Sequence, residues 1–330
     1  MASIKDVAKE AGVSTATVSR VLSNKPHVRA EVRERVLIAI KNLDYRPNLV
    51  ARNLRTRRSN IIGLIVADIR NPYFTSVSRA VEDSAYEHGY SVFLCNTDEN
   101  RKKEEIYINL MRDENVAGVI FAPTQKTAKE IHSLYLNFPT VIIDRGIKIT
   151  EDSAMDLVLI DNVDAAYRLT KQLLEKGKKR IAGIFGKHSY TGKQRQEGFK
   201  KALSEFGLDY STQYARFVSP KISAGKTAAE NLLRLSKPPD AIFTTNSLLT
   251  AGAMSAVLEK GLIIPNEIAI VGFDNPTWTS IVQPPVTVIS QPTEEIGRIA
   301  IDLLHQRIKN PKLPAREVIL QGKLIKRGSV

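Results

Sequence analysis

The sequence has few of the residues that build disulfide-stabilised, zinc-bound or membrane-spanning proteins. Its 330 residues include one cysteine, Cys95, so no intramolecular disulfide can form and no cysteine cluster can hold zinc. The N-terminal segment MASIKDVAKEAG mixes charged with apolar residues and lacks the apolar core of a signal peptide. Apolar runs such as IIGLIVA are far shorter than the roughly 20 residues that cross a bilayer. These absences predict a cytoplasmic protein.

The motifs of common enzyme classes are missing as well. G-x-G-x-x-G, H-E-x-x-H and G-x-S-x-G do not occur, and the five histidines have no metal-ligand spacing. Two stretches resemble a phosphate-binding loop but do not match its motif. GKT at 225–227 would need a glycine five positions earlier, where the sequence has Pro220. GKHSYTGK would need Ser or Thr as the next residue, where the sequence has Gln194. We therefore expect neither an enzyme nor a cofactor or metal site.

Positive charge, in contrast, is abundant and unevenly distributed. The formal net charge is +13, and residues 1–60 hold 13 lysines and arginines against 5 acidic residues, which is +8 of that total. The other 270 residues share the remaining +5. A small, strongly basic N-terminal segment on a chain long enough for more than one domain predicts a polyanionic partner.

Residues 3–43 predict three short helices. Ser3 and Asp6 have capping-box spacing ahead of the first helix, and Gly12 can end that helix in the left-handed conformation. Ser14 is a suitable N-cap for a second helix, and a third is expected at about 30–43. Two short helices joined by a glycine turn, with a third packed across them, form a helix-turn-helix.

The second of these helices has an unusual exposed face. Thr15, Ala16 and Arg20 stand where a surface helix usually carries Glu and Lys. In a major groove, Thr15 and Ala16 could contact base edges and thymine methyl groups, and Arg20 could reach guanine O6 and N7. The pattern alone leaves open a helical bundle with no DNA contact, but the charge asymmetry favours DNA binding.

The next segment, YRPNLVARNLRTRRSN at 45–60, has two interpretations. It is either a basic, flexible linker or a hinge segment that becomes ordered on DNA. In the second case Pro47 lies in the first turn of a short helix, and Leu54 inserts between minor-groove base steps while arginines contact phosphates. Composition alone does not choose between them.

From Ile61 onwards, apolar segments of strand length alternate with amphipathic helical segments. This alternation predicts an α/β core of doubly wound parallel sheets in two lobes. One expected helix covers 128–136. Near the C-terminus a helix at 294–308 and a single strand at 316–325 remain, so the chain is expected to return to the first lobe.

These patterns predict the following domains. They are a helix-turn-helix DNA-binding domain at 1–46, a hinge helix and linker at 47–60, an N-terminal lobe at 61–160 plus about 291–320, and a C-terminal lobe at 161–290 plus about 321–330.

Polar and aromatic residues gather near the expected carboxyl ends of the strands, where such sheets bind ligands. They are Asp68, Asn71, Tyr73, Phe74, Asn96, Asp98, Asp144, Arg145, Asp161, Thr191, Arg195, Asn246 and Asp274. Carboxylates and amides bind pairs of hydroxyl groups, arginine offers forked donors, and rings cover apolar faces, so the set suits a polyhydroxylated ligand. Each residue could instead merely cap its loop.

The stretch IKDVAKEAGVSTATVSRVLSNKPHVRAEVRERVLIAIKNLDYRPNLVARNLR resembles the DNA-binding head and hinge of the lactose/galactose repressor (LacI/GalR) family. The resemblance continues in IGLIVADIRNPYF, VAGVIFAP, FTTNSLLTAGAM and IAIVGFDN, and so covers nearly the whole chain. It implies a helix-turn-helix head, a hinge helix and a two-lobed core similar to that of periplasmic sugar-binding proteins. It also implies a homodimer at the bacterial nucleoid that binds a near-palindromic operator. The C-terminus, LIKRGSV, has no appended heptad segment, which favours a dimer over a tetramer.

The resemblance also implies residue roles. Thr15, Ala16 and Arg20 would read bases, and the paired hinge helices would enter the minor groove with Asn48, Ala51, Leu54 and Arg55. A small effector would bind between the lobes and control operator affinity by favouring one lobe arrangement. The residues implied for this site are Tyr73, Phe74, Asp144, Arg145, Thr191, Arg195, Asn246 and Asp274.

Two departures from the purine-repressor version of the family bear on the effector. Arg145 stands where that version has Trp, and Pro220 falls near its ring-stacking position, so a sugar is expected rather than a purine. Lys187 and Lys193, with Arg145 and Arg195, leave a sugar phosphate open. Induction and co-repression both stay open. A transport solute-binding protein is disfavoured by the basic head, and a sugar- or nucleotide-modifying enzyme by the lack of a catalytic constellation.

Overall fold

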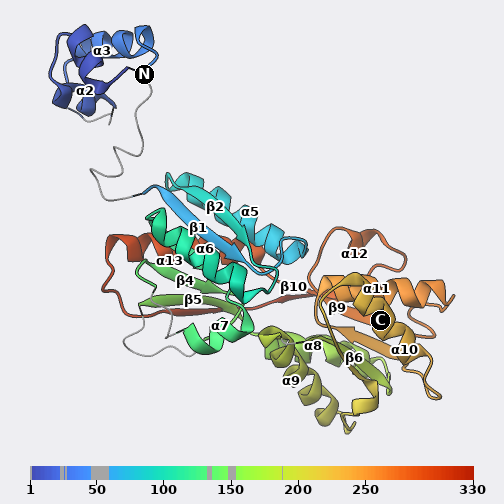
Figure 1. Cartoon of the computed structure of the whole chain (residues 1–330). Helices are drawn as coiled ribbons and strands as arrows, with labels where there is room; N and C mark the ends of the chain where they lie inside the picture. The colour runs from blue at the N-terminus through green and yellow to red at the C-terminus, as the bar shows by residue number, and fades with distance from the viewer. Residues whose placement is uncertain are drawn as a thin grey trace. The chain divides into compact units, whose positions relative to one another are not determined.

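The computed structural model describes residues 2–22, 26, 28–45, 59–131, 136–147, 154–187 and 189–330. The chain divides into two compact units, Met1–Ser59 and Asn60–Val330, each of which is described by itself (Figure 1). The hinge residues Asn48, Ala51, Leu54 and Arg55 lie outside the described residues.

The N-terminal unit is a three-helix head, as predicted. Its helices are α1 (Ile4–Glu10), α2 (Thr15–Leu22) and α3 (Ala30–Asn42). Ser3 forms a capping box with Asp6, Gly12 follows α1 at φ +64°, and the Ser14 hydroxyl accepts a hydrogen bond from the Thr17 amide at 3.2 Å. Each helix contributes one fully buried valine to the core of the head, namely Val7, Val18 and Val36.

The second unit contains two six-stranded sheets, which confirms the predicted two-lobed α/β core (Figure 1). The first part of the chain forms β1 (Ile61–Val66), α5 (Pro72–Glu87), β2 (Ser91–Asn96), α6 (Arg101–Asp113), β3 (Gly118–Phe121), α7 (Gln125–Glu130), β4 (Thr140–Ile143) and β5 (Met155–Ile160). These strands make a sheet of order β11-β5-β4-β3-β1-β2, in which every pair is parallel. Helices α5 and α13 cover one face of it and α6 the other.

The chain then builds the second lobe. Its elements are α8 (Asn162–Glu175), β6 (Ile181–Gly186), α9 (Tyr190–Glu205), a 3-10 turn (Thr212–Tyr214), β7 (Ala215–Val218), α10 (Ile222–Leu233), β8 (Ala241–Thr244), α11 (Ser247–Glu259), β9 (Ala269–Phe273), α12 (Trp278–Ile281) and β10 (Thr287–Ser290). The sheet order is β12-β10-β9-β8-β6-β7, and only the β10–β12 pair is antiparallel among those described. Helices α8 and α9 cover one face, and α10 and α11 the other.

The last segment returns to the first lobe and crosses once more. It forms α13 (Thr293–Lys309), β11 (Glu317–Leu320) and β12 (Lys323–Ile325). The single strand predicted over 316–325 is therefore wrong, because β11 pairs with β5 in the first sheet and β12 pairs with β10 in the second. Gly322 lies between them, where a Cβ atom would come within 2.6 Å of the Ile289 side chain. The chain thus passes between the lobes after β5, after β10 and after β11.

The helix predicted over 128–136 begins three residues earlier than predicted, and residues 132–135 of that range lie outside the described residues. Helix α7 begins at Gln125, where the Thr124 hydroxyl accepts a hydrogen bond from the Thr127 amide at 3.4 Å, and it ends at Glu130. The apolar pattern misplaced this start because the cap is a threonine outside that pattern. The predicted domain boundaries stay a prediction. Among the described residues, no helix is long and apolar enough to cross a membrane.

The Asp156 side chain, at the start of β5, connects three segments of the first lobe through hydrogen bonds. Its side chain is fully buried and accepts two hydrogen bonds of 2.8 Å from the Arg307 guanidinium on α13. The Arg316 guanidinium, just before β11, donates two more at 3.1 and 2.9 Å. Burial by itself would raise the pKa of Asp156, but the two guanidinium groups overcome it and lower that pKa.

Asp156→Asn should destabilise the protein by roughly 3–5 kcal/mol, because it leaves two arginines without their carboxylate. Since folding lowers the pKa of Asp156, its contribution is complete above the unfolded value of about 3.9 and is lost as the pH falls through the lower folded value. Urea unfolding at pH 7 measures the loss, with Asp113→Asn on the exposed side of α6 as control. Equal stability of the two variants would contradict this role.

Candidate functional site

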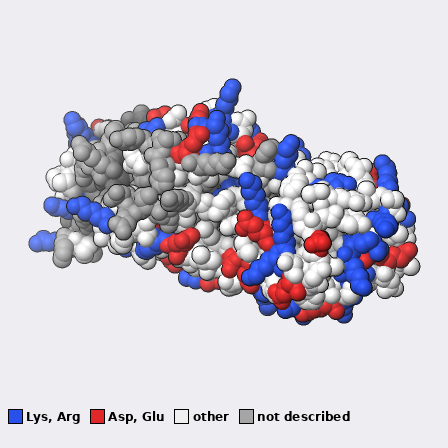
Figure 2. Space-filling view, turned by 90° about the horizontal axis from the view of Figure 1, so that it is seen from below, with Lys and Arg blue, Asp and Glu red and all other residues white. Residues whose placement is uncertain are grey.

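The three residues expected to read bases share the exposed side of α2. Thr15, Ala16 and Arg20 are exposed, whereas Val18 and Val21 on the opposite side are buried in the head. In Figure 2, where the surface is not covered by grey atoms, acidic and basic side chains are interspersed. A continuous basic surface is therefore not seen on this face of the core.

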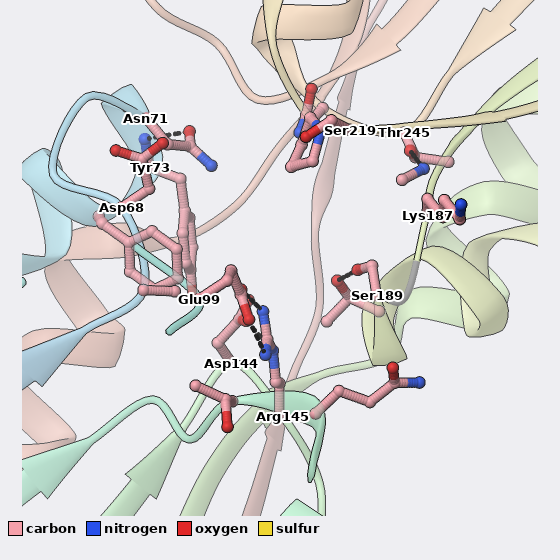
Figure 3. A pocket seen from close by; sticks show the side chains of 18 of the residues that line it. Asp68, Asn71, Tyr73, Glu99, Asp144, Arg145, Lys187, Ser189, Ser219 and Thr245 are labelled. Atoms are coloured by element: carbon pink, nitrogen blue, oxygen red, sulfur yellow. Dashed lines mark hydrogen bonds and ion pairs between the residues drawn. The ribbon is translucent and has the colours of Figure 1, made fainter. Parts of the chain in front are cut away.

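A cleft of about 610 Å³ lies at the carboxyl ends of the strands of both lobes (Figure 3). The structure brings together in it all eight residues expected to bind an effector: Tyr73, Phe74, Asp144, Arg145, Thr191, Arg195, Asn246 and Asp274. Of the wider set, Asp68, Asn71 and Asp98 also line the cleft, but Asn96, Asp161 and Lys193 do not. Lining residues that the sequence did not single out include Glu99, Thr124, Ser189, Ser219, Lys221 and Gln291.

Four carboxylate residues of the cleft adopt the left-handed backbone conformation. They are Asp98 (φ 51°), Glu99 (φ 57°), Asp144 (φ 66°) and Asp274 (φ 70°). Only two other non-glycine residues in the described ranges have a positive φ. Such conformations cost free energy and persist where the surrounding structure imposes them, which is common at ligand sites.

On the second lobe, a buried arginine forms the wall of the cleft. The Arg195 Nε atom donates to Asn162 Oδ1 at 2.8 Å, and Nη1 donates to the Thr245 carbonyl at 2.5 Å. Its guanidinium carbon lies 4.0 Å from the centre of the Phe273 ring. Burial lowers the pKa of Arg195, while Asp274 and Asp144 oppose that shift. The hydrogen-bond acceptors of the guanidinium are thus uncharged, and the nearby Asp274 and Asp144 favour its charged form.

Asp274 connects this wall to a segment that crosses between the lobes. Its Oδ1 accepts a 2.6 Å hydrogen bond from Gln291 Nε2, just after β10. Its Oδ2 accepts a 3.2 Å hydrogen bond from the Ser247 amide in the first turn of α11, where a carboxylate is favourable. A ligand bound to Asp274 would therefore act on a residue of the crossing segment.

On the first lobe, Arg145 is buried beside Asp144 at the end of β4. Its Nη1 atom donates to Glu99 Oε2 and to the Pro123 carbonyl, both at 2.9 Å, and its Nη2 atom donates to Glu99 Oε1 (Figure 3). The Nε atom lies 3.4 Å from Asp144 Oδ2. Burial opposes the charge of Arg145, but Glu99 and Asp144 outweigh it and raise the pKa of Arg145.

Two rings and one helix cap complete the site. Tyr73 and Phe74 are buried at the start of α5, with ring centres 5.0 Å apart and edge to face. Burial, followed by the charges of Asp144 and Asp274, raises the pKa of the Tyr73 hydroxyl well above its ordinary value. Asn246 does cap a helix, because its Oδ1 accepts a 2.8 Å hydrogen bond from the Leu249 amide of α11.

Arg145→Gln should raise the pKa of Asp144 further. Burial already raises that pKa, and Arg145 is the strongest of the nearby charges that oppose the shift. In the wild type, folding raises the pKa of Asp144. The free energy of unfolding therefore decreases as the pH rises from the ordinary aspartate pKa through the raised pKa. Carboxyl-carbon NMR titration measures the change, with Arg79→Gln on the exposed side of α5 as control. An unchanged Asp144 pKa in Arg145→Gln would show that the two groups do not interact.

Comparisons with known proteins agree with this architecture. Residues 59–328 match the family described as "Periplasmic binding proteins and sugar binding domain of LacI family", and residues 3–48 match "Bacterial regulatory proteins, lacI family". The chain is 38% identical over 328 residues to the ribose operon repressor of Halalkalibacterium halodurans, covering 99% of this chain and 96% of that protein. It is 34% identical over 333 residues to the transcriptional repressor PurR of Mannheimia succiniciproducens, covering 100% and 99%.

Solved structures lead to the same family. The complex of the transcriptional regulator CelR with cellobiose superposes with a TM-score of 0.75 at 27% identity, over 100% of both chains. The lac repressor dimer bound to operator and the anti-inducer ONPF superposes with a TM-score of 0.88 at 25% identity, over 99% of this chain and 98% of that one. The chain belongs to the LacI family of DNA-binding transcriptional repressors, with an effector-binding core, and is not an enzyme.

Proposed function

We propose that this repressor binds a near-palindromic operator as a homodimer and that a sugar or sugar phosphate bound in the cleft controls its operator affinity. The observation that carries the proposal is the composition of the cleft. Asp144 lies on the first lobe and Asp274 on the second, and the charges of both raise the pKa of Tyr73. Arg195 is buried and interacts with the same two carboxylates. Carboxylates that accept from hydroxyl groups, a forked donor and two rings suit a polyhydroxylated ring.

A purine is disfavoured by the same cleft. A flat base is held best between apolar or aromatic surfaces, and the two rings of this cleft, Tyr73 and Phe74, lie edge to face. By the family resemblance, Arg145 stands where the purine-repressor version has Trp, and Pro220 falls near its ring-stacking position. The relatives named PurR and ribose operon repressor are about equally similar to this chain, so similarity does not decide the effector.

Two rim lysines keep a sugar phosphate among the candidates. Lys187 and Lys221 line the cleft from the second lobe, and neither side chain forms an ion pair with any described residue. Lys193 is exposed and does not line the cleft. A phosphate group would therefore be expected at the rim of the second lobe.

In the head, we assign base reading to Thr15, Ala16 and Arg20. Their shared exposure on α2, opposite the buried valines, supports this assignment. We assign minor-groove binding to the hinge residues Asn48, Ala51, Leu54 and Arg55, on the strength of the family resemblance.

Exposed apolar residues on the core support a homodimer. On the first lobe, Phe93 and Leu94 are exposed on β2, and Ile106 and Leu110 are exposed four residues apart on α6. Both elements pack beside β1. The second lobe exposes further apolar side chains, Ile222 on α10, Leu258 on α11 and Ile281 on α12. A two-fold axis would bring the same faces of two copies together.

The proposal is tested by fluorescence anisotropy with a labelled palindromic duplex, selected from a random library by the full chain. We expect salt-sensitive binding, and a shift of about 5- to 150-fold in affinity with one member of a panel of sugars, sugar phosphates and purines. The isolated core, residues 60–330, should not bind the duplex. Specific binding by that core would contradict the head assignment, and a response to a purine alone would contradict the effector class.

Two substitutions should separate the two activities. Arg20→Ala should weaken operator binding by about 5- to 150-fold and relax sequence preference, with effector affinity unchanged. Asp274→Ala should keep operator binding and lose the effector response, since it removes a carboxylate from the cleft. The controls are Arg234→Ala and Asp209→Ala, both at exposed positions of the core. If either test variant changed both activities equally, the assignment of its residue would be wrong.

A further inference from the structure

A buried arginine in a sugar-binding cleft is the expected receptor for an anionic group, because a guanidinium binds phosphate or carboxylate through two parallel hydrogen bonds. Arg145 is such an arginine, since only 5% of its surface is exposed and it lines the cleft. Whether it can bind an anionic group depends on which of its hydrogen-bond donors are already used.

The two terminal nitrogens of Arg145 are engaged by this chain itself, whereas its Nε atom is buried without a hydrogen-bond partner among the described residues. Glu99 takes both terminal nitrogens with its two carboxylate oxygens, which is the geometry that a bound phosphate would adopt (Figure 3). The Pro123 carbonyl takes a further Nη1 hydrogen, and Asp144 lies 3.4 Å from Nε. A ligand anion would have to displace Glu99.

The Pro123 carbonyl, which accepts a hydrogen bond from Arg145, is held in place by contacts of the residues that follow it. Glu104 on α6 is fully buried and accepts hydrogen bonds from the Thr124 amide at 2.6 Å and the Thr124 hydroxyl at 3.1 Å. Thr127 also donates its hydroxyl to Glu104. The loop that carries Pro123 is therefore fixed, and Arg145 cannot turn away from Glu99 without losing this carbonyl.

The backbone of Glu99 is equally constrained. Asp98 and Glu99 adopt left-handed conformations in succession, at φ 51° and 57°. The Glu99 amide donates to the Ala67 carbonyl at 3.3 Å, and the next residue, Asn100, caps α6 by accepting from the Lys102 amide at 2.9 Å. Two non-glycine residues in this conformation are costly, which is expected where a side chain must point in one direction.

The other arginines of the first-lobe wall are paired in the same way. Arg70 donates to Asp68 at 3.1 and 3.3 Å, and Arg101 donates to Glu105 at 2.9 Å and to Glu130 at 2.7 Å. On the second lobe, in contrast, Arg195 is held by an amide oxygen and a carbonyl without a carboxylate hydrogen bond.

From this geometry we infer that Glu99 is a specificity-determining residue: it occupies Arg145 so that the first-lobe wall binds the uncharged, hydroxylated part of an effector and rejects phosphate. The inference rests on the proposed function, because it assumes that the effector binds in this cleft. Any anionic group of the effector is then directed to the second-lobe side.

The test is the affinity of the full chain for inorganic phosphate, measured by calorimetry at fixed ionic strength. Glu99→Gln should bind phosphate about ten-fold more tightly than wild type, because it removes an opposing charge and one of the two oxygens that accept from Arg145. The double variant Glu99→Gln/Arg145→Gln should lose that gain. Glu82→Gln, which removes an exposed carboxylate from α5 outside the cleft, is the matched control.

Glu99→Asp keeps the charge and should show no gain, which separates neutralisation from a general loosening of the loop. The inference is overturned if Glu99→Gln binds phosphate no better than Glu82→Gln, or if the double variant keeps the gain. Equal thermal midpoints of the variants would show that the comparison is made on folded protein. No operator DNA is used, so the phosphate result and the operator result can fail separately.

Discussion

Parallel strands of one sheet all end at the same edge, and this constraint governs the rest of the molecule. In each lobe the residues that follow the strands must lie together, whatever their distance along the chain. Asp144 follows β4 in the first sheet and Asp274 follows β9 in the second, yet both act on the hydroxyl of Tyr73. The chain crosses between the sheets three times, so the two strand-end edges face one another across a single cleft.

The two buried arginines of this cleft have different electrostatic roles. Arg145 is neutralised by Glu99 and Asp144, whereas Arg195 makes its hydrogen bonds to the uncharged acceptors Asn162 and Thr245. A buried charge whose hydrogen-bond partners are neutral interacts strongly with the charged groups around it, here Asp274 and Asp144, and with whatever enters the cleft, because little water screens it. The second lobe therefore provides a cation and the acceptor Asp274, and the first lobe provides the acceptor Asp144.

The sequence predicted those features that depend on local patterns. The head follows from caps and a glycine turn within a few residues of one another, and the strand-end residues follow from the parallel topology. The pairing of Glu99 with Arg145 was not predicted, because it joins residues 46 positions apart and gives no periodic signal. The only sign of this pairing in the sequence was that Glu99, an acidic residue, directly follows Asp98 near the end of a strand. The division of 316–325 into two strands was missed because Gln321 and Gly322 are a short interruption that a single strand could also contain, and the pairing partners that separate the two halves lie far away in the sequence.

The hydrogen bond between Asp274 and Gln291 connects the cleft to the segment that crosses from the second lobe to the first. A ligand can shift the lobes only by the difference between its affinities for the two arrangements. Groups that belong to one lobe alone supply no such difference, because they contact the ligand equally in both. Asp274 belongs to the second lobe, the acceptor Asp144 belongs to the first, and Gln291 lies on the crossing between β10 and α13. Helix α13 packs on α5 in the first lobe, the lobe whose first strand begins directly after the hinge segment. Within the core, Asp274 of the second lobe is thus connected through Gln291 and α13 to α5 of the first lobe.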